Sequence, residues 1–274
     1  MIVGWVLLLF ALTVFGATPL LVQGINFNGI APSTRYLPLI MTGMLVTSCA
    51  PTLSALAVAG LYPRAGGTRS VTRQVMRWRV PFVWYAIALI GPIILFLAAE
   101  AFSALRYEVA PRHWMILPSF SGLGGLPFII FGSLFAEEPG WRGFAQPRMQ
   151  TRYGALAASI LIGLLWSTWH LWYVILPGGF SNVTGTDTVA TYIRLTSTAI
   201  IYAWMYNSTD GSLLIAMLSH FGHNLAASFV PTPPDGGRQH LIVSFAYFLV
   251  AVVVVLMTEP RTLRRRTTLV PGAR

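Results

Sequence analysis

The side chains that could perform hydrolytic chemistry lie in three short segments of the chain. The first is Glu137-Glu138-Pro139-Gly140-Trp141-Arg142, the second ends at His170, and the third contains His220, His223 and Asn224. A carboxylate or an imidazole can take a proton from water as the water attacks a carbonyl carbon, and an imidazole or amide N–H can stabilise the oxyanion that forms. Each segment lies within a longer, largely apolar stretch of the chain, where ionisable groups are costly. We therefore interpret the cluster as a candidate functional site.

The spacing of these residues predicts that they meet. A turn is expected near Tyr153; Glu137 precedes it by 16 residues and His170 follows it by 17. At about 1.5 Å per residue, the two arms of an antiparallel helical hairpin would bring the acid and the imidazole to nearly the same depth. His220 and Asn224 are four residues apart, so they share one face of another helix. Four polar groups are thus expected at comparable depth in one bundle.

Glu138 and Arg142 are more easily explained as structural residues. They are four apart, so they lie on one helix face and can form a charge-neutralising pair. Pro139 lies between them and has no N–H to donate, which predicts a kink beside the acids. The helix after the turn carries a stripe of small residues, a pattern that lets neighbouring helices approach closely, at Ala155, Ser159, Gly163 and Ser167.

The composition places this cluster in a membrane protein. The chain has 274 residues, of which 55% are hydrophobic and 9% are charged, whereas about 25% of residues are charged in an ordinary soluble domain. A membrane-spanning helix needs about 20 apolar residues. Apolar segments of that length cover about 1–22, 37–62, 81–104, 126–150, 154–176, 188–206, 211–230 and 240–257. We therefore predict an all-α, polytopic membrane protein with about eight transmembrane helices in one bundle, formed by a single integral-membrane domain over residues 1–274.

The charges predict the orientation of this bundle. The formal net charge is +10, and all 18 basic residues are arginines. With eight crossings, 12 arginines fall on the side that carries both termini and four on the other. Basic residues collect in cytoplasmic loops, so we expect a multi-pass protein of the cell membrane, surrounded by lipid, with both termini in the cytoplasm. Because topology explains the basic balance, no nucleic-acid partner is expected. The single Cys49 forbids an internal disulfide and any cysteine-based metal cluster.

Taken together, the three segments resemble the CPBP family, the CAAX-protease and bacteriocin-processing (Abi) group of intramembrane proteases. The matching segments read EEPGWRG, WSTWH and SHFGHN, and they agree with the family in residue type, order and approximate separation. The resemblance covers about 127–230, which we interpret as a CPBP-like catalytic core; the first 120 residues resemble the family only as apolar spans. Trp166 is a departure, since the family often has phenylalanine there.

The resemblance implies an intramembrane endopeptidase that hydrolyses peptide bonds of hydrophobic or lipid-tethered substrates, in some members prenylated CAAX ends. It further implies that Glu137 activates water together with His170, and that His220 and Asn224 stabilise the oxyanion. Glu138 and Arg142 would support the site.

Two mechanisms fit these residue types. The sequence contains neither an H-E-x-x-H nor a G-x-S-x-G segment, so the usual signatures of zinc proteases and of α/β-hydrolases are missing. We therefore prefer a glutamic-type hydrolysis that needs no cofactor. Glu137, His170 and His220 could instead supply the two-His, one-Glu ligand set of a catalytic zinc, which makes a zinc metalloprotease the alternative.

Two other classes of function compete with a protease. One is a non-catalytic membrane protein of the same fold, acting as an immunity factor or a scaffold. The other is a transporter or proton relay, because acids and histidines inside spans also mark ion paths; the lack of paired repeats and glycine-broken spans disfavours it. Arg194 lies about 9 Å from the outer end of its span, so we expect its side chain to snorkel to the interface.

Overall fold

The computed structural model describes residues 1–265 apart from 27–29, 31–33, 108–125, 180–182 and 230–237. In this described part the regular structure is helical, and the only extended pairing is one isolated bridge between Thr258 and Arg265. The elements run in the order α1 (Ile2–Gln23), α2 (Leu37–Gly60), η2 (Pro63–Ala65), α3 (Arg69–Val75), α4 (Phe82–Tyr107), α6 (Leu126–Phe131), η3 (Gly132–Glu137), η4 (Pro139–Ala145), α7 (Gln146–Tyr153), α8 (Ala155–His170), η5 (Trp172–Ile175), α9 (Gly185–Ser208), α10 (Leu213–Phe229) and α11 (Arg238–Met257). The prediction of an all-α fold is confirmed.

Five segments of the described residues are long and apolar enough to cross a membrane, and they are Ile2–Gln23, Leu37–Gly60, Phe82–Arg106, Ala155–Ile175 and His240–Met257. The chain is thus an all-α polytopic membrane protein. Three other predicted spans lack this length or apolarity, each for a visible reason. The 126–150 segment is divided into short elements, α10 has only 17 residues, and α9 carries Asp187 and Arg194. Eight crossings therefore stay a prediction.

The segment around Pro139 is the main departure from a regular helix. The predicted span 126–150 is not one α-helix: π-helical turns form η3 and η4, on either side of Glu138. Because proline has no N–H, the α-helical hydrogen-bond pattern cannot continue through this position, and the expected interruption takes the form of wide π turns. Such turns occur frequently at functional sites.

The hairpin that follows has the predicted register. α7 ends at Tyr153, Gly154 adopts a positive φ of 80°, and α8 begins at Ala155. The first N–H groups of a helix lack partners within the helix. Here the N–H groups of Ala155 and Leu156 donate to the carbonyl oxygens of Arg261 and Pro260 at 2.9 Å each, so the chain after α11 fixes the start of α8.

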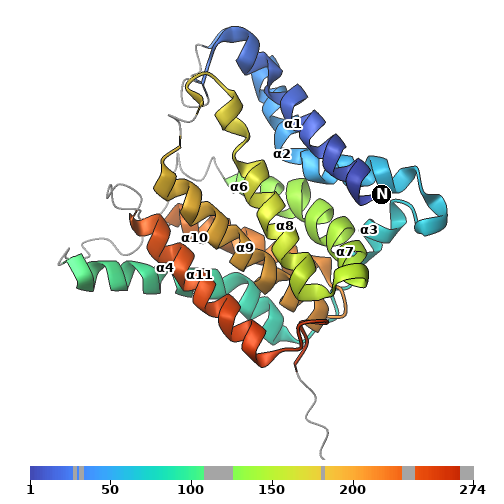
Figure 1. The fold of residues 1–274 in the computed structure, drawn as a ribbon, viewed down its shortest axis with the longest axis vertical. Coiled ribbons are helices and arrows are strands. Elements are labelled where there is room, and N and C mark those ends of the chain that lie inside the picture. Colours follow the sequence, from blue (N-terminus) through green and yellow to red (C-terminus); the bar gives the residue numbers. More distant parts are fainter. Residues whose placement is uncertain (27–29, 31–33, 108–125, 180–182, 230–237, 266–274) are drawn as a thin grey trace, which may run out of the picture.

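The small-residue face of α8 is buried as predicted, and α9 packs on it. A Cβ atom added to Gly163 would lie 2.5 Å from the Cα of Thr196, so only glycine permits this approach. α9 is in turn flanked by α11, while α1 and α2 form an adjacent pair on another side of the bundle (Figure 1).

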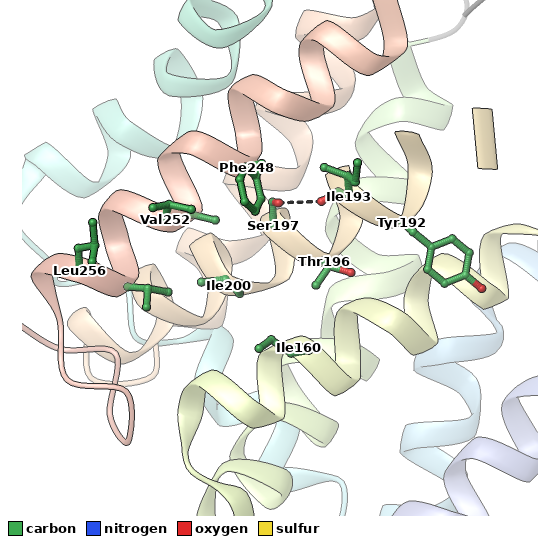
Figure 2. A pocket seen from close by; sticks show the side chains of 11 residues that line it. Ile160, Tyr192, Ile193, Thr196, Ser197, Ile200, Phe248, Val252 and Leu256 are labelled. Carbon is green, nitrogen blue, oxygen red and sulfur yellow. Dashed lines mark hydrogen bonds between the residues drawn. The ribbon is translucent and has the colours of Figure 1, made fainter. Parts of the chain in front are cut away.

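An apolar groove of about 480 Å³ runs along the outside of α9. Figure 2 shows Tyr192, Thr196 and Ile200 along this face of α9, with Ile160 of α8 and Phe248 of α11 on either side. The groove is lined by none of the candidate site residues, which lie on other helix faces.

Candidate active site

Glu137 lies at the end of η3 and is held by α8. The indole Nε1–H of Trp166 donates a hydrogen bond of 2.7 Å to its Oε2. Trp166 is one helical turn before His170, so the hairpin brings the acid to the level predicted for the imidazole. Glu137 is half-buried, and its carboxylate interacts electrostatically with the imidazoles of both His170 and His220. The structure therefore brings three of the predicted residues together around this carboxylate.

His170 is the last residue of α8, and its ring orientation is fixed by its own helix. Its Nδ1 lies 3.0 Å from the carbonyl oxygen of Trp166. A carbonyl oxygen can only accept a hydrogen bond, so Nδ1 carries the proton and Nε2 of the neutral ring keeps its lone pair. The ring also packs edge-on against Trp169, with centroids 4.9 Å apart. The basic nitrogen of His170 is thus Nε2, and the ring orientation that presents it is fixed.

Glu138 is directed to α10, whereas Glu137 is directed to α8, and Glu138 forms a buried ionic cluster. Its Oε1 accepts hydrogen bonds from Arg142 Nη1 at 3.1 Å and from His220 Nδ1 at 2.9 Å. The side chains of Glu138 and Arg142 are fully buried, as expected for a charge-neutralising pair. The guanidinium of Arg142 lies over the rings of Trp166 and Tyr202, at 4.4 and 4.8 Å from the centroids. The pair predicted to be structural therefore also holds His220.

Asn224 lies one turn after His220 on α10, and its amide is oriented from η3. Its Nδ2 donates to the hydroxyl oxygen of Ser133 at 2.9 Å. One N–H of this amide is thereby engaged, and within the part of the chain that the structure describes the second has no acceptor. His223, in contrast, turns away: its Nδ1 lies 2.7 Å from the hydroxyl oxygen of Tyr247 on α11. His223 is thus a neighbour of the site.

Trp166 is the residue whose role the sequence reasoning missed. Its ring packs edge-on against both histidines, with centroids 5.6 Å from that of His170 and 5.5 Å from that of His220. It also supplies the hydrogen bond to Glu137. The four-residue spacing of Trp166 and His170 was the available signal, because it places both side chains on one face of α8.

The side-chain arrangement does not present a preformed zinc site. Across the residues that the structure describes, no three His, Cys, Asp or Glu side chains form a group able to hold a metal ion. Glu137, His170 and His220 each contact the Trp166 side chain, and they do not form such a group. No step below is therefore assigned to a metal, and a requirement for zinc stays an untested expectation.

Comparison with known proteins shows what this chain is similar to. A family model described as type II CAAX prenyl endopeptidase Rce1-like matches residues 118–226. CAAX prenyl protease 2 of Methanococcus maripaludis is 28% identical over 176 residues, which are 60% of this chain and 64% of that protein. The resemblance to the CAAX-protease family is confirmed.

The CAAX-protease-like region contains the whole candidate site, because Glu137, Glu138, Arg142, His170, His220 and Asn224 all fall between residues 118 and 226. Helices α1, α2, α3, α4 and α11 lie outside it. The aligned part spans a little less than two thirds of the curated relative's length.

Proposed function

We propose that this protein is an intramembrane endopeptidase of the CAAX-protease type. Its substrates would be membrane-associated peptides or proteins with a prenylated C-terminal segment. The protein would cross the membrane several times, with both termini in the cytoplasm. The observation that carries the proposal is the arrangement around Glu137: its carboxylate is held by Trp166 and interacts with His170 and His220. The family match over residues 118–226 supports the same conclusion.

In the proposed reaction, Glu137 acts as the base, and His170 uses Nε2, because its Nδ1 carries the proton that is bonded to the carbonyl oxygen of Trp166. Oε1 of Glu137 and Nε2 of His170 would hold a water molecule, and Glu137 would take its proton as the water oxygen attacks the scissile carbonyl carbon. The carbonyl oxygen then becomes an oxyanion. Collapse of this intermediate breaks the C–N bond, and His170 would help carry the proton to the leaving nitrogen.

His220 and Asn224 would stabilise the oxyanion. Glu138 accepts a hydrogen bond from Nδ1 of His220, so a donor at Nε2 requires the protonated ring, which Glu138 stabilises. The free N–H of Asn224 would be the second donor. Preorganised donors of this kind typically contribute about 3 to 4 kcal/mol each to transition-state stabilisation.

The test is cleavage of lipid-tethered peptides by the reconstituted full chain. We expect Glu137→Gln and His170→Ala each to lower kcat/KM about a thousandfold, as for loss of a general base. Glu259→Gln, at an exposed residue after α11, serves as the matched carboxylate control and should retain activity. An unchanged melting temperature would show that the site variants still fold.

Three outcomes would contradict the proposal. Full activity of both site variants would remove Glu137 and His170 from the chemistry. Cleavage of no peptide, with an intact membrane phenotype, would favour the scaffold or immunity protein. Loss of activity on exhaustive chelation, with rescue by zinc, would replace the glutamic mechanism by the metalloprotease.

A further inference from the structure

A pocket of about 730 Å³ lies where the first turn of α4 meets the last turns of α9 and α11. The start of α4 and the end of α11 lie together at one end of the bundle (Figure 1). None of the candidate active-site residues lines this pocket. Binding sites in proteins typically have about 300 to 1,000 Å³ and a mostly apolar lining with a few polar groups. The size and lining of this pocket therefore suit a ligand of its own.

The apolar part of the lining comes from all three helices. The rings of Trp84 in α4 and Trp204 in α9 pack edge-on, with centroids 5.0 Å apart. On α11, Val253 and Met257 lie four residues apart and are 51% and 62% exposed. They belong to a segment long and apolar enough to cross a membrane, so their exposed surface faces lipid. The apolar part of the pocket is thus continuous with the lipid-facing surface of α11.

The polar part of the lining is cationic and comes from the chain just after α11. Arg264 and Arg265 both line the pocket, and both are exposed. Their backbone is held by a folded turn: the N–H of Glu259 donates to the carbonyl oxygen of Arg264 at 2.9 Å, and Leu263 is fully buried. The two guanidinium groups are therefore carried at the end of the span by an ordered segment.

The positive charge at this pocket is only partly compensated. Arg264 Nη2 pairs with Asp210 Oδ1 at 2.7 Å, whereas Arg265 forms no ion pair with any residue that the structure describes. No acidic side chain lines the pocket. The groove along the outside of α9 has no charged lining residue at all, so the two arginines distinguish this pocket from it.

The exposure of these arginines also contrasts with that of Arg194. The expected snorkelling of Arg194 is not what the structure shows, since its Nε is buried. Arg264 and Arg265 instead lie beyond the end of a span, at the side of the bundle for which the arginine distribution predicts a cytoplasmic position. Anionic lipids give the cytoplasmic leaflet a negative surface potential. A phosphate group of such a lipid would therefore lie at the level of these guanidinium groups.

We propose that this pocket binds one anionic phospholipid. Its phosphate pairs with Arg265 and Arg264, and an acyl chain lies against Trp84, Trp204 and Val253. Arginine suits the phosphate because its planar guanidinium forms bidentate, charge-assisted hydrogen bonds to phosphate oxygens. A free phosphate would leave the apolar wall unused, and a neutral lipid would leave Arg265 without a counter-ion; an anionic phospholipid uses both parts of the lining. The inference does not depend on the proposed protease activity.

The experiment measures lipid binding to the full chain in detergent micelles, where no charged membrane surface contributes. The probes are phosphatidylglycerol and phosphatidylcholine with identical acyl chains, and native mass spectrometry gives the fraction of protein that carries each lipid. We expect phosphatidylglycerol to bind about tenfold more tightly, and Arg265→Gln to remove most of this preference, as for loss of a hydrogen bond to a charged group. Binding of phosphatidylcholine should not change.

Arg261→Gln is the matched control. Arg261 is exposed and belongs to the same turn, but it does not line the pocket. The substitution removes the same charge, so it should keep the preference for phosphatidylglycerol. Equal losses in the two variants would show that general attraction to basic residues, and not this pocket, selects the lipid. An unchanged melting temperature of Arg265→Gln would show that the turn still folds.

Two further measurements decide the position and the chemistry of the ligand. Phosphatidylglycerol with a photoreactive group on its acyl chain should cross-link to Val250–Met257 or to the first turn of α4, and cross-links confined to other helices would overturn the proposal. Inorganic phosphate should not displace the lipid. Its displacement by phosphate at equal concentration would indicate a small-anion site and overturn the lipid assignment, as would equal binding of the two lipids by the unaltered protein.

Discussion

At the scale of single residues, the chemistry depends on side chains whose hydrogen bonds fix their orientation. Motif spacing indicated Glu137, His170, His220 and Asn224, and the structure brings the first three around one tryptophan. What spacing could not supply was the direction of each side chain. The successive acids 137 and 138 face different helices, α8 and α10, because they lie about 100° apart around a helix. Glu137 is therefore available to the proposed chemistry, while Glu138 holds Arg142 and His220.

The orientation of Glu137 can be tested by removing one donor, the indole N–H of Trp166. Trp166→Phe removes the indole N–H and keeps an aromatic ring of the type often found at this position in the family. Because a hydrogen bond to a charged group typically contributes about 1.5 to 3 kcal/mol, we expect kcat to fall about tenfold or more while the melting temperature changes little. Activity and thermal melting of the purified protein measure the two effects.

Trp84→Phe is the matched control, because Trp84 packs against Trp204 in another part of the bundle. It should keep full activity. Equal activity of Trp166→Phe and the unaltered protein would show that the hydrogen bond does not position Glu137.

At the scale of elements, periodicity predicted the α7–α8 hairpin and the close-packed face of α8. It did not predict the π turns of η3 and η4. The missing N–H at Pro139 predicts only that the α-helical hydrogen-bond pattern is interrupted there. Whether a kink or π turns result depends on tertiary packing. Gly140 shows this packing: a Cβ atom there would lie 2.3 Å from the carbonyl oxygen of Pro51 in α2. The backbone of η4 is thus pressed against α2.

Gly140→Ala should therefore disturb the segment that carries both acids. The neighbouring atoms belong to backbone and cannot move aside easily, so we expect a loss of stability of about 1 to 3 kcal/mol, as for overpacking of a core. A lower melting temperature and reduced activity would be measured together. Gly91→Ala adds the same methyl group inside α4, where no atom outside its own helix backbone lies within 4 Å, and it should melt no lower than the unaltered protein because alanine is favoured over glycine in a helix. Identical melting of the two variants would mean that the contact between η4 and α2 is not tight.

At the scale of the whole molecule, composition predicted the membrane protein, and hydropathy identified helices that the structure also contains. Hydropathy predicted eight continuous apolar helices, whereas five segments of the described residues have the length and apolarity of a span. The 126–150 segment carries Glu137, Glu138 and Arg142 of the site, and each polar group that a site requires reduces the hydropathy that identifies a span. Sequence reasoning also assigned no role at the site to residues 1–120, which resembled the family only as apolar spans.

Those first helices nevertheless complete the surroundings of the site. Trp5 of α1 is fully buried; its Nε1–H donates to the carbonyl oxygen of Pro51 at 3.1 Å, and its ring meets that of Trp141 in η4 edge-on at 5.2 Å. Trp169 of α8 in turn donates a hydrogen bond of 2.9 Å to Thr13 of α1. α1 is therefore joined to both arms of the hairpin that carries Glu137 and His170.

Trp5→Ala should consequently impair a site that Trp5 does not touch. Replacing a fully buried tryptophan by alanine typically costs about 3 to 5 kcal/mol, and here the cavity would open beside η4. We expect a lower melting temperature in reconstituted protein and, below that temperature, a reduced kcat because η4 and Glu137 are less firmly held. Leu7→Ala on the same helix is the control: Leu7 is 67% exposed, and its loss should change neither quantity. A Trp5→Ala protein that melts lower but retains full kcat would show that α1 stabilises the bundle without positioning the acids.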